Sequence, residues 1–124
     1  MSTEDHIDWT KWNDADFQQY LDENSQALQI PPEIYRRILG KAVEQTRQDI
    51  PQIETAFGVD DIDTIQTISH RWKGDYDNLR MTSLAQAART VNTEAKGGRD
   101  KEVMTSGYEQ FKALFNDMAQ KLGS

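Results

Sequence analysis

The chain has 124 residues and a mass of 14.3 kDa, and its 21 acidic and 14 basic residues give a net charge of -7. A chain of this length forms one domain and can bury about two-thirds of the surface that it exposes when unfolded. Its negative charge repels DNA, RNA and anionic lipid, so we expect no nucleic-acid partner.

The sequence contains no Cys and no long apolar stretch. The chain therefore forms no disulfide and offers no thiolate for catalysis or metal binding. No stretch reaches the ~20 apolar residues of a membrane span, and residues 1–6 lack the basic-then-apolar order of a signal peptide. We expect a cytoplasmic protein that does not enter a membrane.

The N-terminal residues 1–12 are predicted to form a polar arm, followed by a single helical domain over residues 13–124. Apolar residues at helical spacing continue to Leu28, which predicts a first helix from about Asn13, with Asn13 or Asp14 as its N-cap. Trp9 and Trp12 are expected either to attach this helix to the rest of the fold or to contact a partner.

A long second helix is predicted from Pro31 to Phe57. Pro fits the first turn of a helix, whereas Pro51 should either bend the helix or divide it into two stacked segments. Apolar residues recur along it at spacings of three or four, which is typical of an amphipathic helix. The predicted buried stripe is Ile34, Ile38, Ala42, Thr46, Ile50, Ile53 and Phe57.

The next helix is predicted to start at a cap formed by Asp60 or Asp61, after Gly58 ends the long helix. Its apolar face consists of Ile62, Ile65, Ile68, Trp72, Tyr76 and Leu79.

Two further helices complete the predicted domain. The first opens at Ser83, which has capping-box spacing to Gln86, and closes at residues 97–98. The second begins at Asp100 and contains Gly107, a weak position that costs ~1 kcal/mol relative to Ala. No segment alternates with the two-residue period of a strand. The prediction is an all-α fold, an up-down-up-down four-helix bundle over residues 31–122 with an additional N-terminal helix.

His70, Lys73 and Gly74 should share one face of the third predicted helix, opposite its apolar face. Only two histidines are present, His6 and His70, and neither is paired at a spacing that would bind zinc on a helix, so no metal site is expected. Ser69 and Asp77 do not form a triad with His70, because neighbours on a helix point about 100° apart.

The sequence also lacks both glycine-rich nucleotide motifs, so we expect no cofactor and no autonomous kinase activity. An exposed imidazole can attack a phosphoryl group, and Gly74 provides clearance while Lys73 supplies a cation. The competing interpretation is an ordinary solvated histidine.

The segment Ser69-His70-Arg71-Trp72-Lys73-Gly74, followed by Asn78-Leu79, resembles the signature of histidine-containing phosphotransfer (HPt) domains. The resemblance extends over about residues 31–122. It implies a helical bundle in which His70 accepts a phosphoryl group from the aspartate of a receiver domain and passes it to another receiver. Lys73 would stabilise phosphate charge, Gly74 would admit the receiver, and Asn92 would take the position of a glutamine that hydrogen-bonds the imidazole or the phosphate.

The resemblance implies response-regulator receiver domains as partners, together with a hybrid sensor histidine kinase, for a protein acting as a monomer. An alternative is a bundle of the same fold that binds receivers or another regulator as an adaptor, without carrying phosphate. Several residues depart from the family pattern: Trp72 replaces Leu, Arg80 replaces Gly, and Asp75, Tyr76 and Asp77 replace small residues. Asp77 lies on the His70 face, where its charge is expected to oppose a phosphoryl group or raise the imidazole pKa.

Overall fold

The computed structural model describes residues 11–123, so the predicted arm at residues 1–10, including Trp9, lies outside the described part of the chain. Within the described residues every regular element is helical, which confirms the all-α prediction. The elements are α1 (Asp14–Ala27), α2 (Pro32–Gly58), α3 (Ile62–Asn78), α4 (Thr82–Thr93), the π-helical turn η3 (Glu94–Gly98) and α5 (Lys101–Leu122).

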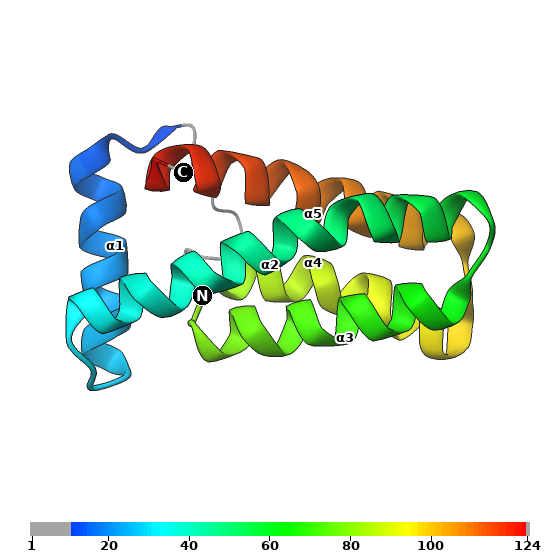
Figure 1. Cartoon of the computed structure of the whole chain (residues 1–124), viewed down its shortest axis with the longest axis horizontal. Helices are drawn as coiled ribbons and strands as arrows, with labels where there is room; N and C mark the ends of the chain where they lie inside the picture. Colours follow the sequence, from blue (N-terminus) through cyan, green and yellow to red (C-terminus); the bar gives the residue numbers. More distant parts are fainter. Residues whose placement is uncertain (1–10, 124) are drawn as a thin grey trace.

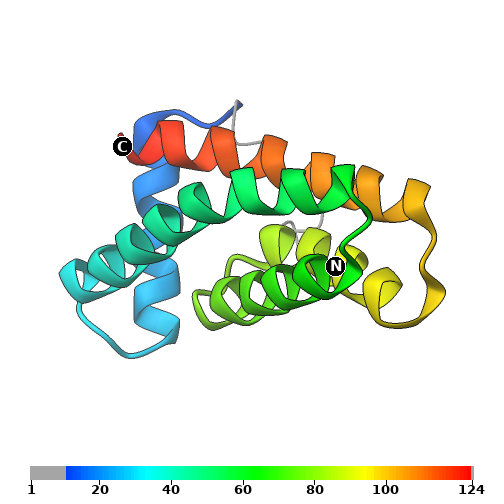
Figure 2. The ribbon, with the colours of Figure 1, turned by 45° about the vertical axis from the view of Figure 1, so that its right-hand side comes forward.

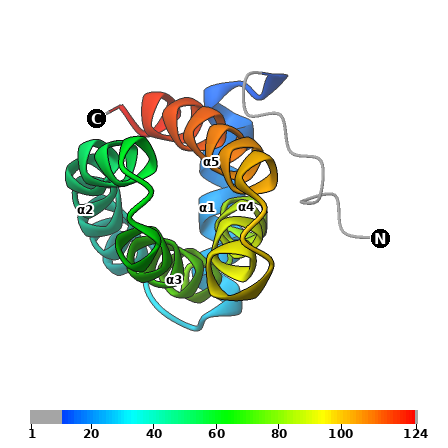
Figure 3. The ribbon, with the colours of Figure 1, turned by 90° about the vertical axis from the view of Figure 1, so that its right-hand side faces the viewer.

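Successive helices from α2 to α5 run in alternate directions along the long axis (Figure 1). Viewed along that axis, these four helices surround a common interior (Figure 3). Figure 2 shows that α1 crosses the end of the molecule at which α2 begins. The closest packing of α3 is against α4, with α2 on its other side. No helix in the range 11–123 combines the length and apolar character that crossing a membrane requires.

Three of the predicted helix starts are confirmed. The Asn13 side chain accepts a hydrogen bond from the backbone N–H of Asp16 at 2.8 Å, which closes a capping box at the start of α1. Asp61 caps α3 and Asp100 caps α5, and each side chain accepts a hydrogen bond from a backbone N–H in the first turn of its helix. The predicted capping box at Ser83 is wrong, because α4 begins one residue earlier, after Met81, and Ser83 is buried in its first turn.

The predicted buried stripe of α2 is partly wrong. The first half of the helix buries Tyr35, Leu39 and Val43, whereas Ile38 is 46% exposed. Both sets recur at helical spacing, so periodicity alone does not distinguish them. Pro51 lies on the exposed side of α2, which continues through it as a single helix.

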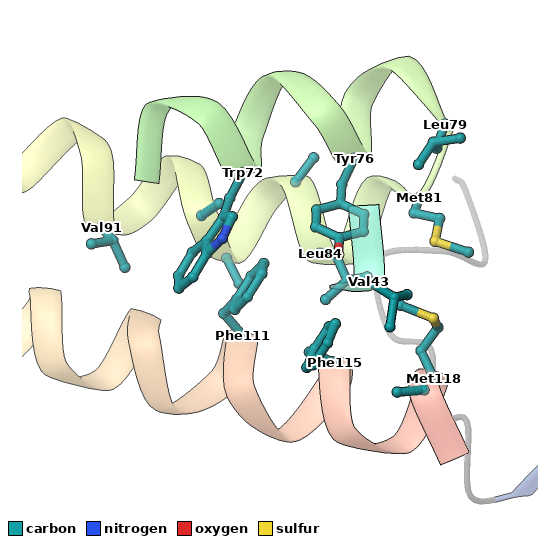
Figure 4. Close-up of a cluster of buried hydrophobic side chains, with 14 of the residues drawn as sticks. Val43, Trp72, Tyr76, Leu79, Met81, Leu84, Val91, Phe111, Phe115 and Met118 are labelled. Carbon is teal, nitrogen blue, oxygen red and sulfur yellow. The ribbon is translucent and has the colours of Figure 1, made fainter. Parts of the chain in front are cut away.

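An aromatic stack fills the interior between α3 and α5 (Figure 4). The Trp72 and Phe111 rings are nearly parallel, with centroids 4.1 Å apart and an interplanar angle of 6°. Phe115 continues the stack beyond Phe111, and the Tyr108 ring also stacks on Trp72. Aromatic pairs of this kind contribute about 0.5–1.5 kcal/mol each beyond the burial of their apolar area. This stack fixes the inner face of α3.

Gly107 is a close-packing position. It is buried, and a Cβ atom there would lie 3.1 Å from the Cγ2 atoms of both Thr90 and Val91 on α4. The missing side chain lets α4 and α5 approach each other. Gly107 therefore has a packing role between α4 and α5 in addition to its cost in helix propensity.

Candidate functional site

His70 lies on the outer face of α3 and is exposed, as helical periodicity predicts. It lies two residues before the fully buried Trp72, and two residues along an α-helix correspond to about 200° of rotation. Burial of the indole therefore directs the imidazole to solvent. Among the described residues, His70 makes no side-chain hydrogen bond or ion pair. Its ring nitrogens are accessible to a reactant.

Gly74 leaves open space one turn after His70. It lies in the interior of α3, and a Cβ atom built on it would meet no atom within 4 Å. Packing among the residues that the structure describes therefore does not require glycine at this position. Gly40 on α2 shows the same open surroundings and provides a reference position far from His70 in the sequence.

Lys73 is the cation closest in sequence to His70 that has no ion pair within residues 11–123. Its side chain is half-buried and lies toward the α4 side of His70 in the helical order of α3. An ammonium group in this position can attract an anionic reactant. The structure thus brings His70, Lys73 and Gly74 together on adjacent turns of one helix.

Asp77 forms an ion pair with Arg89 on α4. One of its carboxylate oxygens lies 2.9 Å from an Nη atom of Arg89, and both side chains are partly exposed. The nearby cation offsets the negative charge that was expected to act on His70. Charge neutralisation by Arg89 was not predictable from α3 alone, because it depends on the packing of α4.

Asp75 and Tyr76 have separate roles. Burial raises the pKa of the Asp75 carboxyl, Arg71 lowers it, and Asp49 raises it further. Tyr76 lies fully in the core, and its hydroxyl lies 2.8 Å from Thr46 Oγ1 on α2. Burial also raises the pKa of the Tyr76 hydroxyl, so this group stays neutral and serves packing.

Arg80 takes the backbone conformation for which glycine is usual. Its φ is 59°, in the left-handed region, and α3 ends there in a Schellman motif. The N–H of Met81 donates to the Tyr76 carbonyl at 2.8 Å, and the N–H of Arg80 donates to the Asp77 carbonyl at 3.0 Å. The helix therefore ends at Asn78 without a glycine.

Asn92 lies beneath the His70 turn and is 2% exposed. Its Nδ2 donates to the Gln66 carbonyl at 3.0 Å and to Ser69 Oγ at 3.3 Å. The Gln66 carbonyl is four residues before His70, and is thus the helical acceptor for the His70 N–H. Asn92 contacts the backbone of the site, and no hydrogen bond joins it to the imidazole in the described structure.

Asp49 was not predicted as a site residue. It is 1% exposed on α2, and its two carboxylate oxygens accept hydrogen bonds from Trp72 Nε1 and from an Nη atom of Arg71, both at 2.9 Å. Gln45 Nε2 donates to the same group at 3.1 Å. A buried Trp N–H needs an acceptor, which is the one sequence signal that points to such a residue.

An apolar pocket of about 480 Å³ opens between the end of α1, the first half of α2 and the end of α3. Ile38 contributes its exposed side chain, and Asp75 and Lys41 are among the polar residues at the margin. The other lining residues are Leu28, Ile30, Ala42, Gln45, Asn78 and Leu79.

No group of three or more His, Asp or Glu side chains that could hold a metal ion occurs in the part of the chain that the structure describes. In comparisons with protein-family models, curated proteins and solved structures, nothing matches this chain.

Proposed function

We propose that the chain is a histidine phosphotransfer protein, an up-down-up-down four-helix bundle of α2 to α5 that carries a phosphoryl group on His70. The observation that carries this proposal is an exposed imidazole that has no side-chain partner within residues 11–123, beside a helical glycine that packing in the same range does not require. A glycine inside a helix costs ~1 kcal/mol relative to alanine, so its place at Gly74 is better explained by access to His70.

The reaction is an exchange of one phosphoryl group between two carriers. The lone pair of a neutral imidazole nitrogen of His70 attacks the phosphorus of an aspartyl phosphate on a receiver domain. The N–P bond forms and the P–O bond to the aspartate breaks, which returns the carboxylate. The second ring nitrogen keeps its proton, so the product ring carries a positive charge beside the phosphoryl oxygens. Lys73 stabilises those oxygens as a point charge.

The partner in this proposal is a receiver domain that docks across the His70 face. The pocket with the exposed Ile38 lies on α2 and α3 and offers an adjoining apolar surface. The protein is proposed to act in the cytoplasm as a monomer and to exchange phosphate with response regulators and a hybrid sensor kinase. It is not itself a kinase.

The direct test is transfer from a phosphorylated receiver domain to the purified chain. We expect acid-labile label on the wild type and none on His70→Gln, with unchanged helical circular dichroism. Equal labelling of the two proteins would refute the assignment. Stable binding of a phosphorylated receiver without any labelling of the wild type would favour the adaptor interpretation.

A matched pair of glycine variants tests the role of clearance. Gly74→Gln and Gly40→Gln each replace a helical glycine whose Cβ would meet no neighbour. We expect each to raise stability by about 0.5–1 kcal/mol, because Gln is a better helix former than Gly. Only Gly74→Gln should slow transfer, measured by single-turnover labelling. If both variants transfer at the wild-type rate, Gly74 does not provide access.

A further inference from the structure

The carboxylate of Asp49 connects α2 to the two residues that directly follow His70. It is 1% exposed and accepts hydrogen bonds from the Arg71 guanidinium and the Trp72 indole, each at 2.9 Å. Isolating a charge from water is costly unless donors surround it. Asp49 meets this requirement through Arg71, Trp72 and Gln45.

These contacts restrain the rotation of α3 about its own axis. The side chains of Arg71 and Trp72 project from α3 about 100° apart. Because one carboxylate binds both of them, it restrains the rotation of α3 as well as the distance between α2 and α3. The opposite side of the same turn is held by Asn92, which donates to the Gln66 carbonyl. The direction of His70 follows from these contacts, because its own side chain has no partner among the described residues.

Asp49 also controls the position of a cation next to the site. The Arg71 side chain is 39% exposed, so it extends to the surface beside His70 while one Nη atom stays on Asp49. Held in this way, Arg71 is drawn toward α2. Lys73 then remains as the cation without an ion pair beside His70 in the described range.

We propose that Asp49 is a positioning residue for phosphoryl transfer, acting through Arg71 and Trp72 to direct the His70 imidazole at the incoming phosphorus. This inference rests on the proposed function. It predicts that loss of the Asp49–Arg71 contact slows the chemical step. Because Asp49 is buried, Asp49→Asn should leave the receiver docking surface unaltered.

The test uses single-turnover transfer over a range of receiver concentrations with Asp49→Asn, Arg71→Met and the double variant. All are made with His6→Gln, which leaves one histidine in the chain. We expect the rate at saturating receiver to fall about 10-fold to 100-fold in each single variant. The half-saturating concentration should be unchanged in Asp49→Asn, because Asp49 is buried. The double variant should be no slower than either single variant, because both break the same contact.

Thr46→Val is the matched control for loss of stability. Thr46 is likewise buried on α2 and contacts α3 through the Tyr76 hydroxyl at 2.8 Å, away from the residues that flank His70. Its rate per folded molecule should equal that of the wild type. A purely structural role for Asp49 would give the same result for Asp49→Asn, and would overturn the proposal. Slowing by Arg71→Met alone would also overturn it, because Arg71 would then act without Asp49.

A receiver-independent measurement separates this inference from the proposed function. Diethyl pyrocarbonate reacts with an accessible neutral imidazole. The rate of its reaction with His70 therefore measures how accessible the ring nitrogens are to a reagent in solution. We expect Asp49→Asn to slow this reaction severalfold and Thr46→Val to leave it unchanged. Unlabelled wild-type protein would count against the proposed function, whereas equal reaction rates in both variants would overturn the positioning role whatever the labelling shows.

Discussion

Arg80→Gly is expected to stabilise the protein by removing the unfavourable left-handed backbone conformation of an L-residue at the end of α3. Arg80 has a φ of 59°, and its side chain makes no hydrogen bond or ion pair within residues 11–123. The left-handed conformation costs an L-residue about 1–2 kcal/mol, and Arg80→Gly removes this cost. The glycine variant also has a more flexible unfolded chain, which offsets about 0.5–1 kcal/mol of the stabilisation. The expected net gain is therefore about 0.5–1 kcal/mol.

For a domain of this size the gain corresponds to a rise in Tm of about 2–4 °C. Thermal and urea unfolding followed by circular dichroism would measure it. Arg80→Ala is the control, since it removes the same side chain and keeps the Cβ atom that makes the conformation unfavourable. The backbone contact from the Tyr20 hydroxyl to the Arg80 carbonyl is available in both variants. Equal Tm changes in the two variants would refute the conformational explanation.

Three further variants test other features of the fold. Asp75→Asn should raise Tm at pH 7 and lose this advantage as pH falls toward 4, because burial raises the folded-state pKa of Asp75 and the protonated form is favoured. Lys112→Met should lower Tm most above pH 5 and least in acid, because the hydrogen bond from Lys112 lowers the folded-state pKa of Glu54, and that stabilisation is lost as pH falls through the lowered pKa. Gly107→Ala should destabilise by about 1 kcal/mol in urea unfolding, because crowding against Val91 outweighs the gain in helix propensity.

The helices and most of their caps were predictable because they depend on residues close in sequence. Asn13, Asp61 and Asp100 each bond backbone N–H groups within three residues of themselves. Such interactions form whatever the rest of the chain does. Helical structure over this stretch was predictable for the same reason, whereas the sequence did not decide whether Pro51 divides the helix. The structure shows that α2 continues through Pro51.

The buried face of α2 was not predictable from periodicity. Two apolar stripes one residue apart, one through Ile38 and one through Leu39, satisfy the same spacing. The choice depends on tertiary contacts, such as the hydrogen bond from the Tyr35 hydroxyl to the Leu79 carbonyl at 2.6 Å. That bond turns Tyr35 inward and leaves Ile38 beside the pocket.

The outward direction of His70 was predictable, but the polar contacts that support it were not. Asn92 was expected at the imidazole or phosphate, whereas it donates to the Gln66 carbonyl and Ser69. Asp49 was not predictable because a carboxylate on a buried stripe resembles a break in the apolar pattern. Both residues act through partners on another helix, and their roles depend on how α2 and α4 pack against α3.

Gly74 and Arg80 are both locally unfavourable, yet they have different explanations. Each occupies a position where another residue would stabilise α3, and each costs about 1 kcal/mol. If glycine at position 74 is needed for access to His70, then Gly74→Gln should raise the free energy of unfolding and slow phosphoryl transfer. Arg80 follows the end of the helix, and relieving it should raise stability at the wild-type transfer rate. The contrast between Gly74→Gln and Arg80→Gly therefore separates an unfavourable residue that serves the reaction from one that does not.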